Sequence, residues 1–232
     1  MSVSSQTTMF LRAAELVAEL HQRPSPDAGE LLRELVEGAT EAVPGAQYGG
    51  ITVTKRRRLS ETAAATHRYP VVLDEIQRRL QQGPCLSAAE GQHSIRIDDL
   101  GADDRWPLYR DEALAHTPIR SILSFGVFRD GQTSAALNFY AEPTRAFDAG
   151  SVDSGLVSAT HTALVWIMLR RDQQFRRAIA SRDVIGQAKG MLMERFDIDA
   201  AAAFVLLKRT SQNSNTPIAR LAQRVVTGDY LR

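Results

Sequence analysis

Strand-forming sequence is confined to the first part of this 232-residue chain, and from Phe147 onward only helical patterns remain. Runs of β-branched and aromatic residues bounded by turn residues predict strands, whereas apolar residues three and four positions apart predict helices. A sheet cannot extend into a segment that contains no strand. We therefore expect an α+β domain over residues 1–170 and a separate helical domain over 171–232.

The first domain is predicted to alternate helices with two hairpins. Helices are expected over 7–22, 28–42, 71–81 and 108–115, and strands over 49–55, 59–66, 94–97, 121–128 and 135–140. Asp130-Gly131 is a strong turn signal between the last two strands, and Gly83-Pro84 is expected to stop the third helix. Hairpin links between helices indicate an antiparallel sheet with flanking helices, packed on one side of it.

A long helix is predicted to begin after Asp148 and to continue to Arg195. At 1.5 Å per residue it would reach about 70 Å, more than one small domain can bury. It is therefore expected to leave the first domain, to bend, or to pair with a second copy of itself. Pairing would bury apolar residues of this helix and make the protein a homodimer. These residues are Leu156, Leu164, Ile167 and Leu169.

Two shorter helices are expected behind the long one, to form a three-helix domain with its last turns. Asp199 is a suitable N-cap for a helix over 200–211, and Thr216 followed by Pro217 for one over 218–226. Apolar stripes on the three helices would form the core. The core set is Ile185, Ala188, Leu192, Phe196, Phe204, Leu207, Ile218, Leu221, Ala222 and Val225.

The net charge of +1 conceals an asymmetry along the chain. Residues 1–169 carry 16 Lys and Arg against 21 Asp and Glu, whereas residues 170–232 carry 12 against 6. A net charge of +6 on a helical tail favours contact with a polyanion such as a nucleic acid. A solvated helix face would show the same excess, so charge alone leaves both readings open.

The basic tail contains a recognisable string of residues, RDVIGQAKGMLMER over Arg182–Arg195. It is followed by Ala203-Phe204, Leu207-Lys208-Arg209, Ser211, Asn215 and Leu221-Ala222. This pattern resembles the ANTAR domain, the three-helix RNA-binding module of bacterial antitermination regulators. The resemblance implies that the tail binds structured RNA with paired stem-loops and keeps a terminator hairpin from forming.

The motif and the charge together mark six candidate RNA-binding residues. They are Arg182, Lys189, Lys208, Arg209, Ser211 and Asn215. Basic side chains hold phosphates, and hydroxyl or amide groups hydrogen-bond bases or phosphates. Lys189 is the strongest candidate, because its small neighbours Ala188 and Gly190 are expected to leave room for a phosphate or a loop base.

Further motifs are spread over the first domain. They are Gly83-Pro84-Cys85-Leu86, Ile97-x-Asp99-Leu100, Arg105-Trp106-Pro107, Ile119–Ser124 and Ala136–Tyr140. Together they resemble a GAF domain of the kind that precedes ANTAR in actinobacterial proteins. The resemblance implies a sensor that binds a small molecule or responds to another signal, and it does not name the ligand.

No pattern in the sequence indicates catalysis, a cofactor or a metal site. A Gly-x-Ser-x-Gly elbow and a Gly-x-x-x-x-Gly-Lys phosphate loop are both absent, so we expect a non-enzyme. The five histidines have no metal-ligand spacing; they are His21, His67, His93, His116 and His161. The chain has no run of 18 apolar residues and no signal peptide, which predicts a cytoplasmic protein outside the membrane.

Three smaller features leave alternatives open. Cys85 is either a sensing thiol or an inert, partly buried side chain. The acidic cluster of Asp98, Asp99, Asp103 and Asp104 either holds a cation or caps helices in a solvated loop. The basic turn 55–58 either touches nucleic acid or is a solvated tip. For the whole chain, the alternative function is a ligand-sensing GAF protein whose helical tail mediates protein interaction or dimerisation without RNA.

Overall fold

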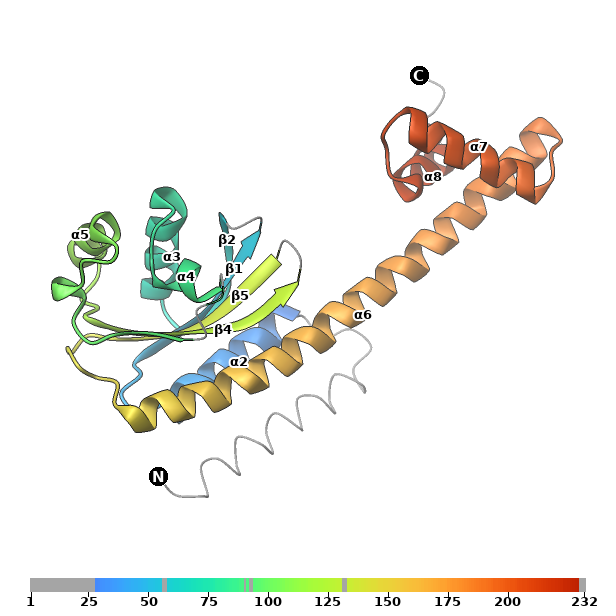
Figure 1. Ribbon diagram of the computed structural model, residues 1–232. Helices are drawn as coiled ribbons and strands as arrows, with labels where there is room; N and C mark the ends of the chain where they lie inside the picture. Colours follow the sequence, from blue (N-terminus) through green and yellow to red (C-terminus); the bar gives the residue numbers. More distant parts are fainter. Residues whose placement is uncertain (1–27, 56–57, 90, 92–93, 131–132, 230–232) are drawn as a thin grey trace. The chain divides into compact units, whose positions relative to one another are not determined.

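A computed structural model describes residues 28–55, 58–89, 91, 94–130 and 133–229 (Figure 1). These residues belong to two compact units, which divide between Met168 and Leu169. The helix expected over 7–22 lies outside the described residues.

The first unit contains a five-stranded antiparallel sheet in the order β2-β1-β5-β4-β3. Its strands are β1 (Tyr48–Lys55), β2 (Arg58–Ala65), β3 (Ser94–Ile97), β4 (Ser121–Asp130) and β5 (Thr133–Ala141). The two expected hairpins are confirmed as β1–β2 and β4–β5. β5 lies at the centre of the sheet, where it pairs with both β1 and β4.

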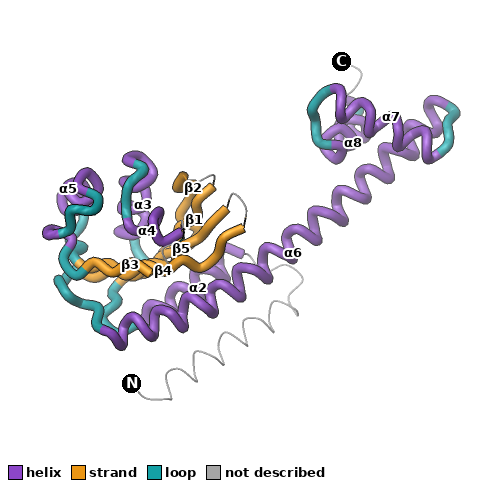
Figure 2. The backbone as a smooth tube through the Cα atoms, in the orientation of Figure 1, coloured by secondary structure: helices purple, strands orange, loops and turns teal. Residues whose placement is uncertain are grey.

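Helices cover both faces of the sheet, as Figure 2 shows. On one face lie α2 (Ala28–Ala42) and the first part of α6 (Ala149–Phe196), and on the other lie α3 (Arg68–Leu80), α4 (Pro84–Ala89) and α5 (Pro107–His116). Adjacent glycines of β1 mark the two faces. A Cβ on Gly49 would meet Thr40 of α2, whereas one on Gly50 would meet Pro70 of α3.

The expected antiparallel sheet with flanking helices is thus confirmed, although the helices lie on two sides and not on one. The sequence of β1 does not show this, because Ile51-Thr52-Val53-Thr54 alternates apolar and polar residues, as a strand with one solvated face does, whereas both threonines are buried. Six successive residues of β1, from Gly49 to Thr54, are buried.

The chain between α3 and β3 departs from its prediction. α3 begins at Arg68, three residues earlier than expected, because the Nδ1 atom of His67 accepts a hydrogen bond from the Tyr69 backbone N–H at 3.3 Å. Gly83 has a φ of 141° and turns the chain. A short helix, α4, then begins at Pro84, since proline suits the first turn of a helix as well as it stops one.

The long helix α6 begins as expected after Asp148. The Asp148 carboxylate accepts from the Ser151 backbone N–H at 2.8 Å, and the Ser151 hydroxyl accepts from the Asp148 backbone N–H at 3.0 Å. These reciprocal bonds satisfy backbone donors at the helix start. The helix continues without interruption to Phe196, over 48 residues.

Within the described part of the chain, α6 is the one helix long and apolar enough to cross a membrane by length and composition. Half of that apolar window is buried inside the protein, and a core helix of a soluble protein passes the same test. Its polar side chains also suit packing on the sheet. The Ser158 and Thr162 hydroxyls are buried and donate to backbone carbonyls one turn earlier, both at 2.8 Å.

The second unit contains the end of α6 together with α7 (Ala200–Asn213) and α8 (Ile218–Thr227). Its buried core consists of Ala188, Leu192, Ala203, Leu207, Leu221 and Ala222. The expected cap of α7 is confirmed, because Asp199 accepts from the Ala202 backbone N–H at 2.7 Å. Thr216 does not cap α8 as expected. Pro217 occupies that position, and the Thr216 hydroxyl donates to the Ser214 carbonyl at 3.2 Å.

Candidate nucleic-acid interface and the polar interior of the first unit

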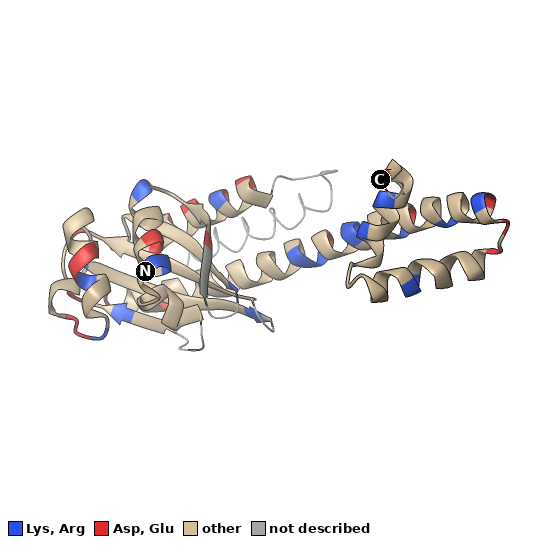
Figure 3. Cartoon of the chain, turned by 90° about the horizontal axis from the view of Figure 1, so that it is seen from above, with Lys and Arg blue, Asp and Glu red and all other residues tan. Residues whose placement is uncertain are grey.

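Lys and Arg recur along α6, as the blue bands of Figure 3 show. Of the four basic candidates, Arg182, Lys208 and Arg209 are exposed and Lys189 is partly buried. Within the described residues none of the four forms an ion pair with an acidic side chain, whereas Arg176 pairs with Asp172 at 2.7 Å. Cations without an acidic partner remain available to phosphate groups.

Lys189 connects α6 to α7 through an aromatic contact. Its Nζ atom lies 6.0 Å from the ring centroid of Phe204. A Cβ added at Gly186 or Gly190 would meet no atom within 4 Å, so the helix surface beside Lys189 is open there. The expectation for Ala188 was wrong in one respect. Ala188 is fully buried in the three-helix core, so its small size serves helix packing and leaves no space at the surface.

The positions of the other basic residues follow from helix geometry. Arg182 lies seven residues, or about two turns, before Lys189 and therefore on the same side of α6. Lys208 lies one turn after Phe204 and shares its side of α7. Arg209 is five residues after Phe204, about 140° away around the helix. Helix spacing therefore places Arg182 beside Lys189 on α6 and Lys208 on the Phe204 side of α7, with Arg209 on a different face.

Ser211 and Asn215 lie in the connection between α7 and α8. The Ser211 hydroxyl donates to the Thr216 carbonyl at 2.6 Å, which commits it to closing that connection. Asn215 is exposed and has a φ of 48°. Asn tolerates this left-handed conformation better than most residues. The local turn thus accounts for both residue types, and their contact with RNA stays a prediction.

In the first unit, a row of polar side chains crosses four strands on the face covered by α3. Thr62 of β2 is paired with Thr52 of β1. The Asn138 Nδ2 atom of β5 donates to the Thr52 hydroxyl at 2.9 Å, and Ser124 of β4 is paired with Asn138. We call these four residues the polar row. Thr52, Ser124 and Asn138 are buried.

Asp74 of α3 lies on the polar row and is itself buried. Its carboxylate accepts from the Thr52 hydroxyl at 2.7 and 2.8 Å and from the Thr62 hydroxyl at 2.7 Å. Burial raises the pKa of Asp74 to about 7, although the two hydroxyl bonds lower it in part. Among the described residues no cation pairs with this carboxyl, so its neutral form is favoured.

α3 and α4 pack over the polar row and add further polar groups to it. The Gln77 Oε1 atom accepts from the Cys85 backbone N–H at 3.0 Å, and the Cys85 Sγ atom lies 3.4 Å from the Tyr140 hydroxyl. Gln77 Nε2, Tyr109 OH and Asn138 Oδ1 are buried and have no hydrogen-bond partner among the described residues. Each such group costs about 1–3 kcal/mol in a closed core. This interior therefore contains buried donors and acceptors that the described residues do not satisfy.

Cys85 is fully buried within this interior. Burial raises the pKa of its thiol to about 12, and Asp74 adds to that rise. The thiolate is the reactive form of cysteine. Of the two alternatives left open by the sequence, the geometry therefore favours the inert, buried side chain.

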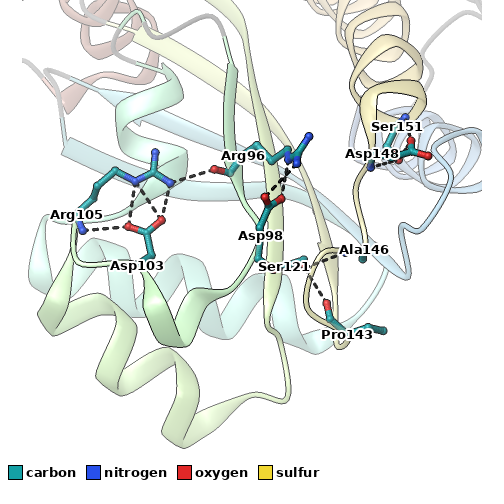
Figure 4. A network of polar contacts seen from close by, with 9 residues as sticks. All are labelled: Arg96, Asp98, Asp103, Arg105, Ser121, Pro143, Ala146, Asp148 and Ser151. Carbon is teal, nitrogen blue, oxygen red and sulfur yellow. Dashed lines mark hydrogen bonds and ion pairs between the residues drawn. The ribbon is translucent and has the colours of Figure 1, made fainter.

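The acidic cluster is engaged by arginines, as Figure 4 shows for two of its members. Asp98 pairs with Arg96 at 2.6 Å and Asp103 with Arg105 at 2.5 Å, and each arginine lowers the pKa of its partner. The other two members are also used locally. Asp104 pairs with Arg110 at 2.6 Å, and Asp99 accepts from the Gly101 backbone N–H at 2.9 Å at the start of η1 (Leu100–Ala102). The cluster therefore serves the loop structure.

The remaining candidates have local roles where they are described. His67 caps α3 and stacks on Tyr48 with ring centroids 4.7 Å apart, while the His116 ring bonds to the Glu112 carbonyl at 2.9 Å. His161 is buried, and Lys55 pairs with Glu61 at 3.8 Å. His21, His93 and residues 56–57 lie outside the described residues. Within the described ranges, no three His, Cys, Asp or Glu are grouped to hold a metal ion.

Comparison with known proteins agrees with the division into two units. The family model for the GAF domain matches residues 25–166, and that for the ANTAR domain matches residues 173–226. No curated protein matches the chain.

Two solved structures resemble this chain in fold. One is the GAF domain of a phosphoenolpyruvate-protein phosphotransferase from Coxiella burnetii, with a TM-score of 0.51, 14% identity, and coverage of 73% of this chain and 98% of that one. The other is free methionine-R-sulfoxide reductase from Neisseria meningitidis, with a TM-score of 0.51, 15% identity, and coverage of 74% and 95%. At such identities the likeness shows the fold alone.

Proposed function

Because this chain belongs to the GAF domain family and carries an ANTAR domain behind its GAF domain, we propose that it is a signal-responsive RNA-binding regulator that acts by transcription antitermination. Its target is structured RNA with paired stem-loops, bound through residues 171–232. The observation that supports this proposal is the placement of Arg182 beside Lys189 on α6 and of Lys208 on the Phe204 side of α7. These three cations have no acidic partner among the described residues.

The mechanism is a shift between two folds of one RNA. A protein that binds the stem-loops better than the competing terminator hairpin raises the population of the stem-loop fold by its differential affinity. Basic side chains supply affinity through phosphates, and unpaired loop bases supply recognition. No bond is made or broken in this scheme. We accordingly propose a non-enzyme that works in the cytoplasm, where transcripts are made.

Two stem-loops suit a protein that presents two ANTAR domains, so the active form is a homodimer. Supporting evidence is the exposure of large apolar side chains on α6, with Leu156 at 55%, Leu164 at 56% and Ile167 at 41%. Leu169 was expected in the same stripe, but it is buried and belongs to the core. A single particle mass near 25.6 kDa in light scattering at micromolar concentration would contradict the dimer.

The signal acts on the GAF domain, and the polar row with Asp74 is the place where a small molecule would bind there. Gln77 Nε2 offers a buried donor and Asn138 Oδ1 a buried acceptor, and both lack a partner among the described residues. A ligand with complementary polar groups would satisfy them and stabilise the domain.

The proposal is tested by RNA binding at two salt concentrations. RNAs crosslinked to the protein in cells are recovered, and one with paired stem-loops is used for titration. Lys189→Ala should lower affinity by about 1–3 kcal/mol and make the salt dependence shallower. Arg176→Ala is the matched control, since it removes the same charge from the same helix but from a cation already paired with Asp172. Its effect on affinity should be small.

Two results would contradict the proposal. If no RNA is specifically recovered and the wild-type protein binds stem-loop RNA no better than a duplex, the tail is an interaction or dimerisation element. If the RNA binds but transcription past its terminator in a purified system is unchanged by the protein, RNA binding stands and antitermination fails.

A further inference from the structure

An exposed aromatic ring lies within the basic surface of the second unit. Phe204 is 42% exposed, although its neighbours Ala203 and Leu207 on α7 are buried in the three-helix core. The core set inferred from the sequence included Phe204, and the structure corrects this. On a helix, Phe204 lies about 100° around from Ala203, which turns part of the ring away from the core.

Two lysines lie on the same side as Phe204. The Lys189 Nζ atom lies 6.0 Å from its ring centroid, and Lys208 follows one turn later on the same side of α7. Exposed apolar residues are common and need no explanation one at a time. A ring bordered by two cations without acidic partners is more specific, because it joins a stacking surface to phosphate-binding groups.

The surface of α6 next to Lys189 is open at two positions. A Cβ at Gly186 or Gly190 would meet nothing within 4 Å, so no side chain from these positions obstructs the surface next to Lys189. The ligand favoured by this surface is a nucleic acid with unpaired bases. Bases within a duplex are stacked on one another and cannot lie on a protein ring.

We propose that Phe204 is a base-stacking residue: an unpaired base from an RNA loop lies on the exposed part of its ring, and Lys189 holds a neighbouring phosphate. This inference rests on the proposed RNA binding and adds to it a residue that distinguishes loops from paired stems. Lys189 has a double role here, since its position over the ring also places a cation beside the stacked base.

The test separates stacking from charge. Phe204→Leu keeps an apolar side chain but removes the ring, and it should weaken binding of a stem-loop RNA about 5- to 150-fold. Because no charge is lost, the dependence of affinity on salt should stay as in the wild type, whereas Lys189→Ala should make it shallower. Phe204→Tyr restores a ring and should recover most of the affinity. Val205→Ala, which trims the 61% exposed neighbour, should have little effect.

A second measurement does not depend on the leucine variant folding. Phe204→Trp introduces an indole at the proposed stacking position, and its fluorescence should be quenched when the stem-loop RNA binds but not when a fully paired duplex of equal length is added. Trp106 and Trp166 lie in the first unit and supply a constant background, which the wild-type protein measures.

The outcomes distinguish this inference from the proposed function. If the wild-type protein binds no stem-loop RNA, the proposed function fails. If it binds, and Phe204→Leu binds equally well, or Phe204→Tyr binds as poorly as the leucine variant, or the tryptophan signal is unchanged by RNA, then Phe204 does not stack a base and this inference alone is overturned. RNA affinity that is unchanged in Phe204→Leu while a protein partner is lost would likewise overturn it.

Discussion

The Thr52 hydroxyl of β1 lies 2.7 and 2.8 Å from the two carboxylate oxygens of Asp74 on α3 and donates its proton to that carboxyl. Burial raises the pKa of Asp74 to about 7, since a charge without a cationic partner is unfavourable in a low-dielectric interior. An acid of this kind binds its proton more tightly in the folded chain than in the unfolded one, where its pKa is about 3.9.

We expect the stability of the first unit to fall as the pH rises from about 4 to 7. In that window the folded state keeps the Asp74 proton and the unfolded state has lost it, so raising the pH favours unfolding, and the effect levels off above pH 7. The pKa difference corresponds to at most about 4 kcal/mol. Asp74→Asn should remove this part of the pH dependence, as measured by urea unfolding of both proteins between pH 4.5 and 8.

Asp98→Asn is the matched control for this experiment. Asp98 is partly exposed, and Arg96 lowers its pKa, so its contribution to stability is lost only as the pH falls through its folded pKa, below the window. Its variant should follow the wild-type slope between pH 5 and 8. Identical slopes for Asp74→Asn and wild type would show that the buried carboxyl does not change its charge in this range.

Gly155 is expected to allow the close packing of α6 against the sheet, because no side chain fits there. A Cβ at this position would lie 2.3 Å from Cε2 and 2.6 Å from Cζ of Phe125, a ring that is itself fully buried. Gly155→Ala should therefore lower the stability of the first unit by about 1–3 kcal/mol through overpacking. Gly186→Ala, in an open part of the same helix, should instead raise helix stability by up to about 1 kcal/mol.

Thermal melting of the two glycine variants checks this prediction. The expected result is a lower midpoint for Gly155→Ala and an unchanged or higher one for Gly186→Ala. A Gly155→Ala protein as stable as the wild type would mean that α6 does not approach β4 as closely as described.

Much of the fold could be predicted because its elements are encoded locally. The helix over 28–42 was predicted with its exact bounds, since Leu31, Leu35 and Val36 form one apolar stripe and Val43-Pro44-Gly45 ends it. The long helix was predicted because nothing between Asp148 and Phe196 interrupts it. α4 was missed because a Gly-Pro pair marks a helix stop and a helix start equally well, and only the packing of Cys85 and Leu86 into the core decides which.

The candidate sites were less accessible from the sequence. Charged residues of the motif were expected at the surface and are there, but only helix phase separates Arg209 from Lys208. The same helical spacing could have shown that Phe204 points in a different direction from Ala203 and Leu207, which form the core face of α7. The sequence did not identify Asp74 as a buried acid, because an acidic residue next to a core residue such as Leu73 is normally exposed on a helix. The hydroxyls that meet Asp74 come from β1 and β2, and such pairing across elements has no local signature.

The Cys85 thiol should be unreactive in the folded protein. It is fully buried, and its pKa of about 12 leaves almost no thiolate at neutral pH. An aromatic disulfide reagent at pH 8 should therefore detect no thiol in the native protein and one thiol per chain in urea. Cys85→Ala should bind RNA as the wild type does, with a loss of stability of about 1 kcal/mol for the smaller side chain. Rapid labelling of the native protein would instead favour a sensing thiol.

The exposed apolar stripe of α6 should control the oligomeric state. Leu164 and Ile167 are 56% and 41% exposed, so neither is required by the core, and burying them against a second copy would stabilise a dimer through apolar contact. Leu164→Asp would place two carboxylates at such an interface and should yield monomers without unfolding the chain. Thr160→Asp is a suitable control, because the Thr160 side chain is exposed and donates a hydrogen bond to the Leu156 carbonyl of its own helix. Light scattering should give half the wild-type mass for Leu164→Asp, and this variant should bind a single stem-loop as before while losing the preference for paired stem-loops. A wild-type mass for Leu164→Asp would exclude this stripe from the interface, and an unchanged preference for paired stem-loops in a monomeric variant would show that one chain suffices for both.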